Sequence, residues 1–361
     1  MHPVLVVGAG NVGSLIALLL AHSNQYQVFL GDLNQERLNK LKKHRNLHTL
    51  QFDINDEKLI AEFMAAHQVE AVIACLPYFC SLTIAKLADQ YAVHYFDLTE
   101  DVAVVEAVKI LAKNKTKAFV PGCGLAPGFI DIVAHTLAST FDEIDIIKLR
   151  AGGLPVNASN ALQYALTWST DGLINEYGNM CYGIVDGKMT PLLPLEGLEL
   201  VDLDGTCYEA FNTSGGVGSL IDTYLGKANT LNYKTLRYPG HRDKIAFLMK
   251  DLRLNNDRET LKQIFEAAMP STNKDVMIIY VSVTGRKNGK LIEENYLNKV
   301  YGQQVVGQHW SAIQVTTASC LCAVLDRVLN DADQYHGLVR QEQFSLADVI
   351  TNQFGALLST E

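Results

Sequence analysis

Three glycines near the start of the chain have a spacing that suits phosphate chemistry. Gly8, Gly10 and Gly13 lie in the segment Gly-Ala-Gly-Asn-Val-Gly, between a predicted strand at 4–7 and a helix that starts near Val12. The first glycine permits a tight turn, the second lets a diphosphate approach the backbone, and the third lets helix and strand pack closely. The helix N-terminus adds free amides and a positive dipole. In this context the motif predicts a dinucleotide-binding turn.

An acidic residue, Asp32, ends the second predicted strand about 20 residues after Gly13, where a carboxylate can accept hydrogen bonds from the adenosine ribose hydroxyls. A carboxylate there repels a 2′-phosphate, so the sequence favours NAD over NADP. NADP stays an alternative because Asn34 and Arg37 lie nearby and could rearrange around a phosphate. The residues expected to bind the cofactor are Gly8, Gly10, Asn11, Val12, Gly13, Asp32, Leu76 and Pro77.

Two candidate catalytic residues follow the fourth and fifth predicted strands, at the carboxyl edge where an open parallel sheet binds its ligand. Tyr78 comes directly after Leu76 and Pro77 and is a candidate for contact with nicotinamide or substrate. Asp97 follows the fifth strand and could bring a carboxylate to the same edge. The structural alternatives are a buried loop aromatic for Tyr78 and, for Asp97, a cap on the helix after Asp101.

Two glycine-containing loops are candidates for substrate binding. The segment 121–128 has three glycines and two prolines, which suits a backbone held close to a ligand, and Gly124 is its candidate contact. Cys123 has no neighbouring base in the sequence, so a packed thiol is favoured over a redox nucleophile. The segment 211–216 offers the hydroxyl of Thr213 and backbone amides to a carboxylate or a ribose. A plain turn is the alternative there.

The segment 233–241, Tyr-Lys-Thr-Leu-Arg-Tyr-Pro-Gly-His, concentrates two cations and an imidazole in nine residues that end in a proline-glycine turn. Arg237 can bind a carboxylate through two parallel hydrogen bonds, as an amino-acid substrate requires, and Lys234 adds a second positive charge. His241 carries the side chain whose ordinary pKa suits proton transfer near neutrality. Taken singly, Lys234 and His241 are more often surface or core residues. Together the three favour a substrate site, with His241 or a bound water carrying protons.

The scaffold for these residues is predicted from the hydrophobic pattern. Over residues 1–122, short β-branched runs alternate with helix-length segments, which indicates a Rossmann-type doubly wound parallel sheet, an α/β fold. The predicted strands are 4–7, 28–30, 49–52, 71–74, 94–96 and 118–120. The predicted helices are 14–22, 35–44, 57–67, 82–90 and 102–114.

A second domain of mixed α+β structure is predicted over 123–310, where glycine clusters and the alternating runs 144–150 and 276–284 appear. Residues 311–361 are expected to form helices that pack back on the first domain, at 311–329 and at 346–354 with Ser345 as the N-cap. Because no linker separates the domains, the site is expected in a cleft between them.

Composition restricts the partners. The chain has 361 residues, 48% of them hydrophobic, and a formal net charge of −9, which argues against nucleic acid or anionic lipid and for a small-molecule substrate. The seven cysteines lack CxxC spacing, so neither a disulfide framework nor a metal site is expected. Neither an export signal nor a stretch that could span a membrane is evident, so a cytoplasmic location is expected.

Several motifs, in order along nearly the whole chain, are similar to those of the saccharopine dehydrogenase family, and within it to the lysine 6-dehydrogenases. The segments that carry this resemblance are 8–13, 122–128 (GCGLAPG), 152–155 (GGLP), 209–216 (EAFNTSGG), 233–241 (YKTLRYPGH) and 285–290 (GRKNGK). The resemblance implies a Rossmann domain, and a substrate domain whose β-sheet mediates formation of a homodimer or larger homo-oligomer. It also implies NAD(P)-dependent oxidation of the ε-carbon–nitrogen bond of lysine or saccharopine, giving aminoadipate semialdehyde.

Departures from the family pattern favour lysine over saccharopine. Glutamate-forming saccharopine dehydrogenases carry GLDPG and an Asn-Arg-Asp-Ser segment where this chain has GLAPG at 124–128 and Asn-Thr-Ser-Gly at 212–215. The missing arginine would weaken binding of the extra dicarboxylate arm by about 1–3 kcal/mol, although Arg237, Lys234 or Arg286 could compensate. Two alternatives remain: an enzyme resembling carboxynorspermidine dehydrogenase, which would want an acidic pocket, and a non-catalytic NAD(P) sensor.

Overall fold

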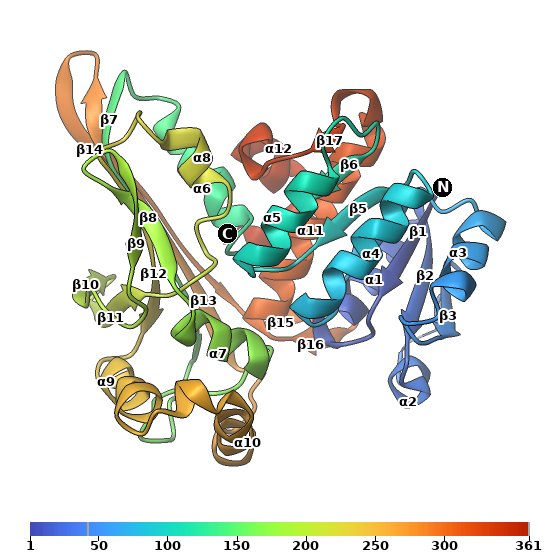
Figure 1. Ribbon diagram of the computed structural model, residues 1–361, viewed down its shortest axis with the longest axis horizontal. Coiled ribbons are helices and arrows are strands. Elements are labelled where there is room, and N and C mark those ends of the chain that lie inside the picture. The colour runs from blue at the N-terminus through green and yellow to red at the C-terminus, as the bar shows by residue number, and fades with distance from the viewer. Residues whose placement is uncertain (42, 360–361) are drawn as a thin grey trace. The chain divides into compact units, whose positions relative to one another are not determined.

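The computed structural model describes residues 1–41 and 43–359. Contacts between Cα atoms divide the chain into two compact units. The first comprises residues 1–128, 305–308 and 314–358, and the second comprises residues 129–304 and 309–313. Each unit is built on its own β-sheet (Figure 1). The predicted domain limits of 1–122, 123–310 and 311–361 stay predictions.

The first unit contains a parallel sheet in the order β17-β6-β5-β4-β1-β2-β3. The chain runs outward from β1 to β3, returns to β4 beside β1, and runs outward again on the other side. This reversal defines a doubly wound sheet, so the predicted fold class is confirmed. The strands are β1 (His2–Val7), β2 (Tyr26–Asp32), β3 (Leu47–Gln51), β4 (Ala71–Ala74), β5 (His94–Asp97), β6 (Ala118–Val120) and β17 (Gly337–Leu338).

The helices of this unit follow their predicted positions, with changes at the ends. They are α1 (Asn11–His22), α2 (Gln35–Asn39), α3 (Glu57–Ala66), α4 (Tyr78–Gln90) and α5 (Val102–Leu111). Helix α4 begins at Tyr78, directly after Pro77 and four residues earlier than predicted. Helix α2 ends at Asn39, before the predicted end at His44, and Lys42 within that prediction lies outside the described residues.

One face of the sheet is covered by α3, α4 and α5. Strand residues such as Leu5, Val7 and Val72 pack there against Ile60 and Ile84, and all are buried. Strand side chains alternate between the two faces, which explains why every second residue of β1 belongs to this core. At about 25 cal/mol per Å² of apolar surface, burial of this kind supplies most of the folding free energy.

The C-terminal segment completes the first unit. Helix α11 (Ala312–Asn330) is followed by β17, which adds a strand beside β6, and by α12 (Leu346–Thr351). The side chain of Ser345 accepts a hydrogen bond from the amide of Asp348 at 3.0 Å, so the predicted N-cap is confirmed. Short 3₁₀ turns at Ala332–Gln334 and Gln341–Gln343 connect these elements, and a third at Gly355–Leu358 follows α12.

Helix α11 corrects one sequence-based expectation. Its length and composition are sufficient to cross a membrane, whereas the sequence reading found no such stretch. However, 78% of its most apolar 18-residue window is buried inside the protein. Val315, Leu321 and Leu325 have no exposed surface. A core helix meets the same length and hydropathy criteria as a membrane helix, and burial identifies α11 as a core helix.

The second unit contains a mixed sheet in the order β10-β11-β12-β7-β13-β14, with β8 pairing with β12 and β9. The predicted α+β character is confirmed. Its strands are β7 (Glu143–Pro155), β8 (Cys181–Val185), β9 (Lys188–Leu192), β10 (Glu199–Leu203), β11 (Thr206–Asn212), β12 (Thr230–Arg237), β13 (Asp275–Lys287) and β14 (Lys290–Tyr301), and β15 (Gln303–Val305) and β16 (Gln308–Trp310) form a separate pair. Its helices are α6 (Phe129–Ala138), α7 (Thr170–Gly178), α8 (Leu220–Tyr224), α9 (His241–Ala246) and α10 (Arg258–Ala268).

This sheet is curled, so that strands at its two ends approach each other. Lys299 of β14 donates to the carbonyl oxygen of Leu203 at 3.2 Å and pairs with Asp204 at 3.0 Å, although β10 and β14 lie at opposite ends of the strand order. The curled face encloses an apolar cluster that includes Ala210 and Leu236. On the other face Phe211 joins the cores of α7, α9 and α10.

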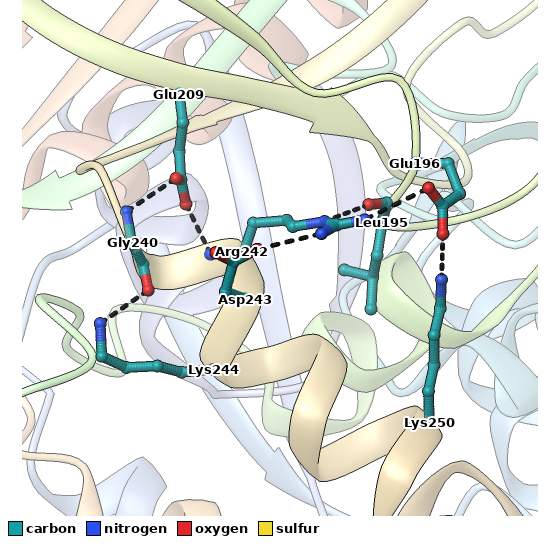
Figure 2. Close-up of polar contacts among 8 residues, drawn as sticks. All are labelled: Leu195, Glu196, Glu209, Gly240, Arg242, Asp243, Lys244 and Lys250. Atoms are coloured by element: carbon teal, nitrogen blue, oxygen red, sulfur yellow. Dashed lines mark hydrogen bonds and ion pairs between the residues drawn. The ribbon is translucent and has the colours of Figure 1, made fainter.

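A buried carboxylate fixes the start of α9. Glu209 of β11 accepts hydrogen bonds from the amides of Gly240 at 2.8 Å and Arg242 at 2.5 Å (Figure 2). Gly240 has a φ of 89°, the left-handed region that favours glycine. Arg242 extends the network to the carbonyl of Leu195 and to Glu196. Glu209 thus supplies acceptors for amides that a helix N-terminus leaves unpaired.

We expect Glu209→Ala to lower the free energy of unfolding by about 2 kcal/mol, because two part-buried amides lose their acceptor. Glu209→Gln keeps one acceptor oxygen and should cost less. Urea denaturation followed by circular dichroism measures both variants. A Glu209→Ala protein as stable as the parent would contradict the capping role.

Candidate functional site

The three glycines between β1 and α1 each have a different steric environment. Gly8 has a φ of 109°, and a Cβ there would lie 2.3 Å from the carbonyl oxygen of Cys75. A Cβ on Gly13 would lie 2.0 Å from the carbonyl oxygen of Gly8. A Cβ on Gly10, by contrast, would meet nothing within 4 Å. The turn is therefore closely packed at Gly8 and Gly13 and open at Gly10, as approach by a diphosphate requires.

Asp32 lies at the end of β2, next to this turn. One carboxylate oxygen accepts from the amide of Ala9 at 2.6 Å and the other from the amide of Asn34 at 2.7 Å. The guanidinium of Arg37 is 4.0 Å away, and it is more than half exposed. The carboxylate is thus held beside the glycine turn at the carboxyl edge of the sheet, where ribose recognition takes place in this fold.

The other predicted cofactor residues lie around the same turn. Asn11 and Val12 are the first residues of α1, so their amides belong to the helix N-terminus, which favours phosphate. Leu76 and Pro77 follow β4, the neighbour of β1, and Leu76 Cδ2 would be 3.2 Å from a Cβ on Gly8. The structure therefore brings the predicted cofactor residues together within the first unit.

Of the two candidates at the strand ends, Tyr78 and Asp97, only Tyr78 retains some exposure. Tyr78 is the first residue of α4, half-buried, with its ring against Phe79. Asp97 is fully buried. It accepts hydrogen bonds from the amide of Gly122 at 2.7 Å, the amide of Thr99 at 3.0 Å and the hydroxyl of Tyr95 at 2.6 Å.

These contacts give Asp97 a structural role in joining β5 to the loop after β6, in place of the predicted catalytic one. Burial raises the pKa of Asp97 to about 6, while its three hydrogen bonds oppose the rise. It does not cap α5 either, since Asp101 accepts from the amide of Val104 there.

The loop 121–128 is tightly packed. A Cβ on Gly128 would lie 2.0 Å from the carbonyl oxygen of Gly124, and one on Gly124 would lie 3.4 Å from Thr317 Cγ2. Cys123 is fully buried, and burial raises the pKa of its thiol well above the usual value. The packed-thiol interpretation of Cys123 agrees with this environment. Among residues 1–41 and 43–359, no group of three or more His, Cys, Asp and Glu could hold a metal ion.

The predicted cationic pair of the second unit is divided between the two faces of the sheet. Lys234 and Arg237 are three residues apart on β12 and so point to opposite faces. Lys234 donates to the carbonyl of Gly197 at 2.6 Å and to Glu199 at 2.8 Å, and Glu199 also binds Arg150 at 2.5 Å. Lys234 is thus one member of an internal ion network, and it does not join Arg237 in one pocket.

Arg237 and His241 are connected through Tyr177 of α7, which the sequence reading missed. Arg237 Nε donates to the Tyr177 hydroxyl at 2.8 Å, and that hydroxyl lies 3.0 Å from His241 Nε2. His241 Nδ1 lies 2.7 Å from the carbonyl oxygen of Leu162. The hydroxyl can therefore donate to Nε2 while Nδ1 donates to the carbonyl.

Burial, aided by the charge of Arg237, lowers the pKa of His241 to about 3. The ring is neutral and both of its nitrogens are engaged. Neither ring nitrogen of His241 is thus available to a substrate, as the predicted role in proton transfer would require.

Arg237 is also more fully occupied than predicted. Its Nη1 donates to Thr235 Oγ1 at 2.6 Å and to the carbonyl of Leu236 at 2.9 Å, and its Nη2 is 3.4 Å from Glu176. Only 3% of its side chain is exposed. An acidic residue that was not predicted, Glu176, therefore lies beside Arg237. Its signal in the sequence is weak, because Glu176 stands in the mixed segment Leu-Ile-Asn-Glu-Tyr at 173–177.

Thr213 lies where β11 ends, against α7. The amide of the next residue, Ser214, donates to the carbonyl of Glu176 at 3.0 Å, and the Ser214 hydroxyl donates to the carbonyl of Asn175 at 3.0 Å. The Thr213 hydroxyl is buried and has no hydrogen-bond partner within the part of the chain that the structure describes. Thr213, Arg237 and Glu176 thus lie on adjoining elements of the second unit.

Comparison with known proteins agrees with this architecture. The saccharopine dehydrogenase NADP-binding domain matches residues 4–120, and the saccharopine dehydrogenase C-terminal domain matches residues 124–360. Among solved structures, the chain is similar to apo saccharopine dehydrogenase (L-Glu forming) from Saccharomyces cerevisiae, with a TM-score of 0.79, 16% identity, and coverage of 97% of this chain and 96% of that one. It is also similar to the homospermidine synthase of Legionella pneumophila in complex with NAD, with a TM-score of 0.68, 14% identity, and coverage of 100% and 90%.

The parallel sheet, its glycine turn and the two matched domains define the class: an oxidoreductase with a nicotinamide dinucleotide-binding domain. The chain belongs to the saccharopine dehydrogenase family. The resemblance that the motifs predicted is therefore confirmed at the level of the family. The two solved structures, at such low identity, support the fold alone.

The raised pKa of Asp97 gives a prediction on stability. Its folded value of about 6 exceeds the usual 3.8, so the folded protein binds more protons than the unfolded chain between these values. The contribution to stability is complete below pH 4 and is lost as pH rises through 6. Relative to Asp97→Asn, the parent should lose about 3 kcal/mol of unfolding free energy between pH 4 and pH 7.

Urea titrations of both proteins at several pH values provide this measurement. The quantity compared is the difference in unfolding free energy between parent and variant. It is needed because other buried groups, such as His241 with its lowered pKa, change the stability of both proteins with the opposite dependence on pH. A difference that stays constant with pH would show that Asp97 titrates normally in the folded state.

Proposed function

We propose that this protein is an NAD(P)-dependent dehydrogenase that oxidises the ε-carbon–nitrogen bond of lysine or saccharopine, giving aminoadipate semialdehyde. The observation that carries the proposal is the open glycine turn beside Asp32, in a chain matched from residue 4 to residue 360 by two saccharopine dehydrogenase domains. Lysine is favoured as the substrate because the sequence lacks the arginine of the glutamate-forming pattern in 212–215. A homodimer or larger homo-oligomer and a cytoplasmic location are part of this proposal.

The residues at the glycine turn fit a dinucleotide. The open side of Gly10 and the amides of Asn11 and Val12 would hold the diphosphate, and Asp32 would accept from the ribose hydroxyls, which favours NAD. When bound, the nicotinamide supplies the hydride acceptor for the chemistry. Tyr78, half-buried at the start of α4, is the candidate for contact with the reacting groups.

A second candidate function is oxidation or reduction of a polyamine conjugate such as carboxynorspermidine. The observation in its favour is that both cations expected to bind a carboxylate already have carboxylate partners: Glu199 for Lys234 and Glu176 for Arg237. An amine-rich substrate needs acidic groups of this kind. The third possibility, an NAD(P) sensor without catalysis, predicts nucleotide binding with no turnover.

The test is the appearance of NADH or NADPH absorbance with lysine, saccharopine and carboxynorspermidine, each with both cofactors. We expect the highest kcat/KM for lysine with NAD. Turnover of carboxynorspermidine alone would establish the second candidate. Nucleotide binding without turnover of any of the three amines would favour the sensor, and absence of nucleotide binding would refute all three.

Asp32→Ala should weaken NAD binding 10- to 100-fold, because two hydrogen bonds to a charged acceptor are lost. It should also narrow the preference for NAD over NADP, since the charge that repels a 2′-phosphate is removed. The matched control is Glu36→Gln, which removes an exposed charge nearby. Fluorescence titration with NADH and NADPH measures these affinities. Equal NAD affinity in the parent and Asp32→Ala would disprove the ribose contact.

A further inference from the structure

Glu176 is an acidic residue that has no role so far in the proposed oxidation of lysine or saccharopine. It lies on α7 in the second unit, with 13% of its side chain exposed, beside an arginine that is 3% exposed. The contact between Glu176 Oε2 and Arg237 Nη2 is long, at 3.4 Å. The Glu176 side chain therefore keeps a small exposed area, and its carboxylate lies beside a buried cation.

Arg237 cannot move closer to strengthen this contact. Its Nε is bound to Tyr177, and its Nη1 is bound to Thr235 and to the carbonyl of Leu236. Its guanidinium carbon also lies 4.8 Å from the centre of the Tyr164 ring. These contacts hold Arg237 in place behind Glu176. Among the residues that the structure describes, the long contact to Arg237 is the one side-chain interaction of the carboxylate.

The remaining groups around Glu176 do not compensate for its burial. The charged and titratable side chains that act on it or respond to its charge are Arg237 and Tyr233 of β12, Tyr177 of α7, Tyr164 before α7, and Cys181 of β8. Burial raises the pKa of each of these phenols and of the thiol, so Arg237 is the charged one near neutrality.

Burial raises the pKa of Glu176 itself to about 7, although Arg237 opposes the rise. A carboxylate that ionises this reluctantly beside an arginine is short of hydrogen-bond donors. One further donor with a positive charge would stabilise its ionised form.

A second polar group nearby has unused hydrogen-bonding capacity. The buried hydroxyl of Thr213 has no hydrogen-bond partner within the described residues, and its neighbour Ser214 is tied to the backbone of Glu176. A buried hydroxyl that stays unpaired costs free energy. A buried polar atom without a partner calls for an explanation, and a bound ligand that supplies the missing hydrogen bond is one.

We propose that Glu176 binds an ammonium group of the substrate, with Arg237 as a positioning residue behind the carboxylate and the Thr213 hydroxyl as an adjoining polar contact. The ligand class is a primary ammonium on an amino acid or polyamine chain. The inference rests on the proposed function for the identity of the substrate. The sequence predicted that Arg237 binds a substrate carboxylate. Here Glu176 binds a substrate ammonium instead, and Arg237 holds Glu176 in place.

The test is calorimetric binding of L-lysine to the full chain in the presence of NADH, with Glu176→Gln as the variant. The control is Glu196→Gln, which neutralises a carboxylate paired with Arg242 at 3.2 Å on the surface of the same unit. At pH 8 we expect Glu176→Gln to bind lysine at least tenfold more weakly than the parent, and Glu196→Gln to bind it as well as the parent does.

The parent's affinity for lysine should rise several-fold per pH unit up to about pH 7 and then level off, because the ionised carboxylate binds the ammonium. The variant should lose this dependence.

Two lysine analogues separate ligand binding from a structural role. L-norleucine lacks the ε-ammonium and 6-aminohexanoate lacks the α-ammonium. If Glu176 holds one ammonium, Glu176→Gln weakens only the analogue that retains it. Equal weakening of both analogues, or of neither, would overturn the inference, as would a parent protein that binds none of the three ligands.

These measurements need no turnover. A parent protein that oxidises neither lysine nor saccharopine with either cofactor would refute the proposed function and leave the ammonium contact standing. Normal lysine binding by Glu176→Gln in an active enzyme would refute the ammonium contact alone.

Discussion

The guanidinium of Arg237 carries a positive charge into the interior of the second unit, and the surrounding structure neutralises it. A buried cation without partners would be strongly destabilising. The neighbouring groups therefore arrange around it: Tyr177 and Thr235 accept its hydrogen bonds, and Glu176 supplies the opposite charge. Because the Tyr177 hydroxyl also contacts His241, the same interaction fixes the neutral imidazole. The buried charge thus joins α7, β12 and α9.

Two of the family motifs meet in this region for a topological reason. Strands β11 and β12 are antiparallel neighbours, with Glu209 opposite Arg237 and Asn212 opposite Lys234. The segments 209–216 and 233–241 are therefore adjacent in space although about 20 residues separate them. Glu209 then reaches past the end of β12 to hold the first amides of α9. The motifs form one structural element, which explains why both accompany the same substrate domain.

In the first unit, close packing of the backbone shapes the candidate site, whereas in the second unit the buried charge of Arg237 does so. Gly8 has no room for a side chain because the carbonyl oxygen of Cys75, the residue after β4, lies beside it, and Gly13 has none because the carbonyl oxygen of Gly8 lies beside it. This close packing leaves Gly10 as the open face of the motif. Asp32 is held against the same turn through the amide of Ala9. The dinucleotide site is consequently a rigid feature of the sheet edge.

The sequence by itself predicted the doubly wound sheet of the first unit and the candidate cofactor residues beside it, because the period of buried side chains and the glycine spacing of 8–13 are local properties. It also located the motifs of the second unit. Only the tertiary structure decided what those residues do. Strand alternation put Lys234 and Arg237 on opposite faces, and packing of α7 against the sheet brought Glu176 and Tyr177 to Arg237 from about 60 residues away. Contacts between segments so distant in sequence depend on long-range packing, and neither composition nor spacing encodes them locally.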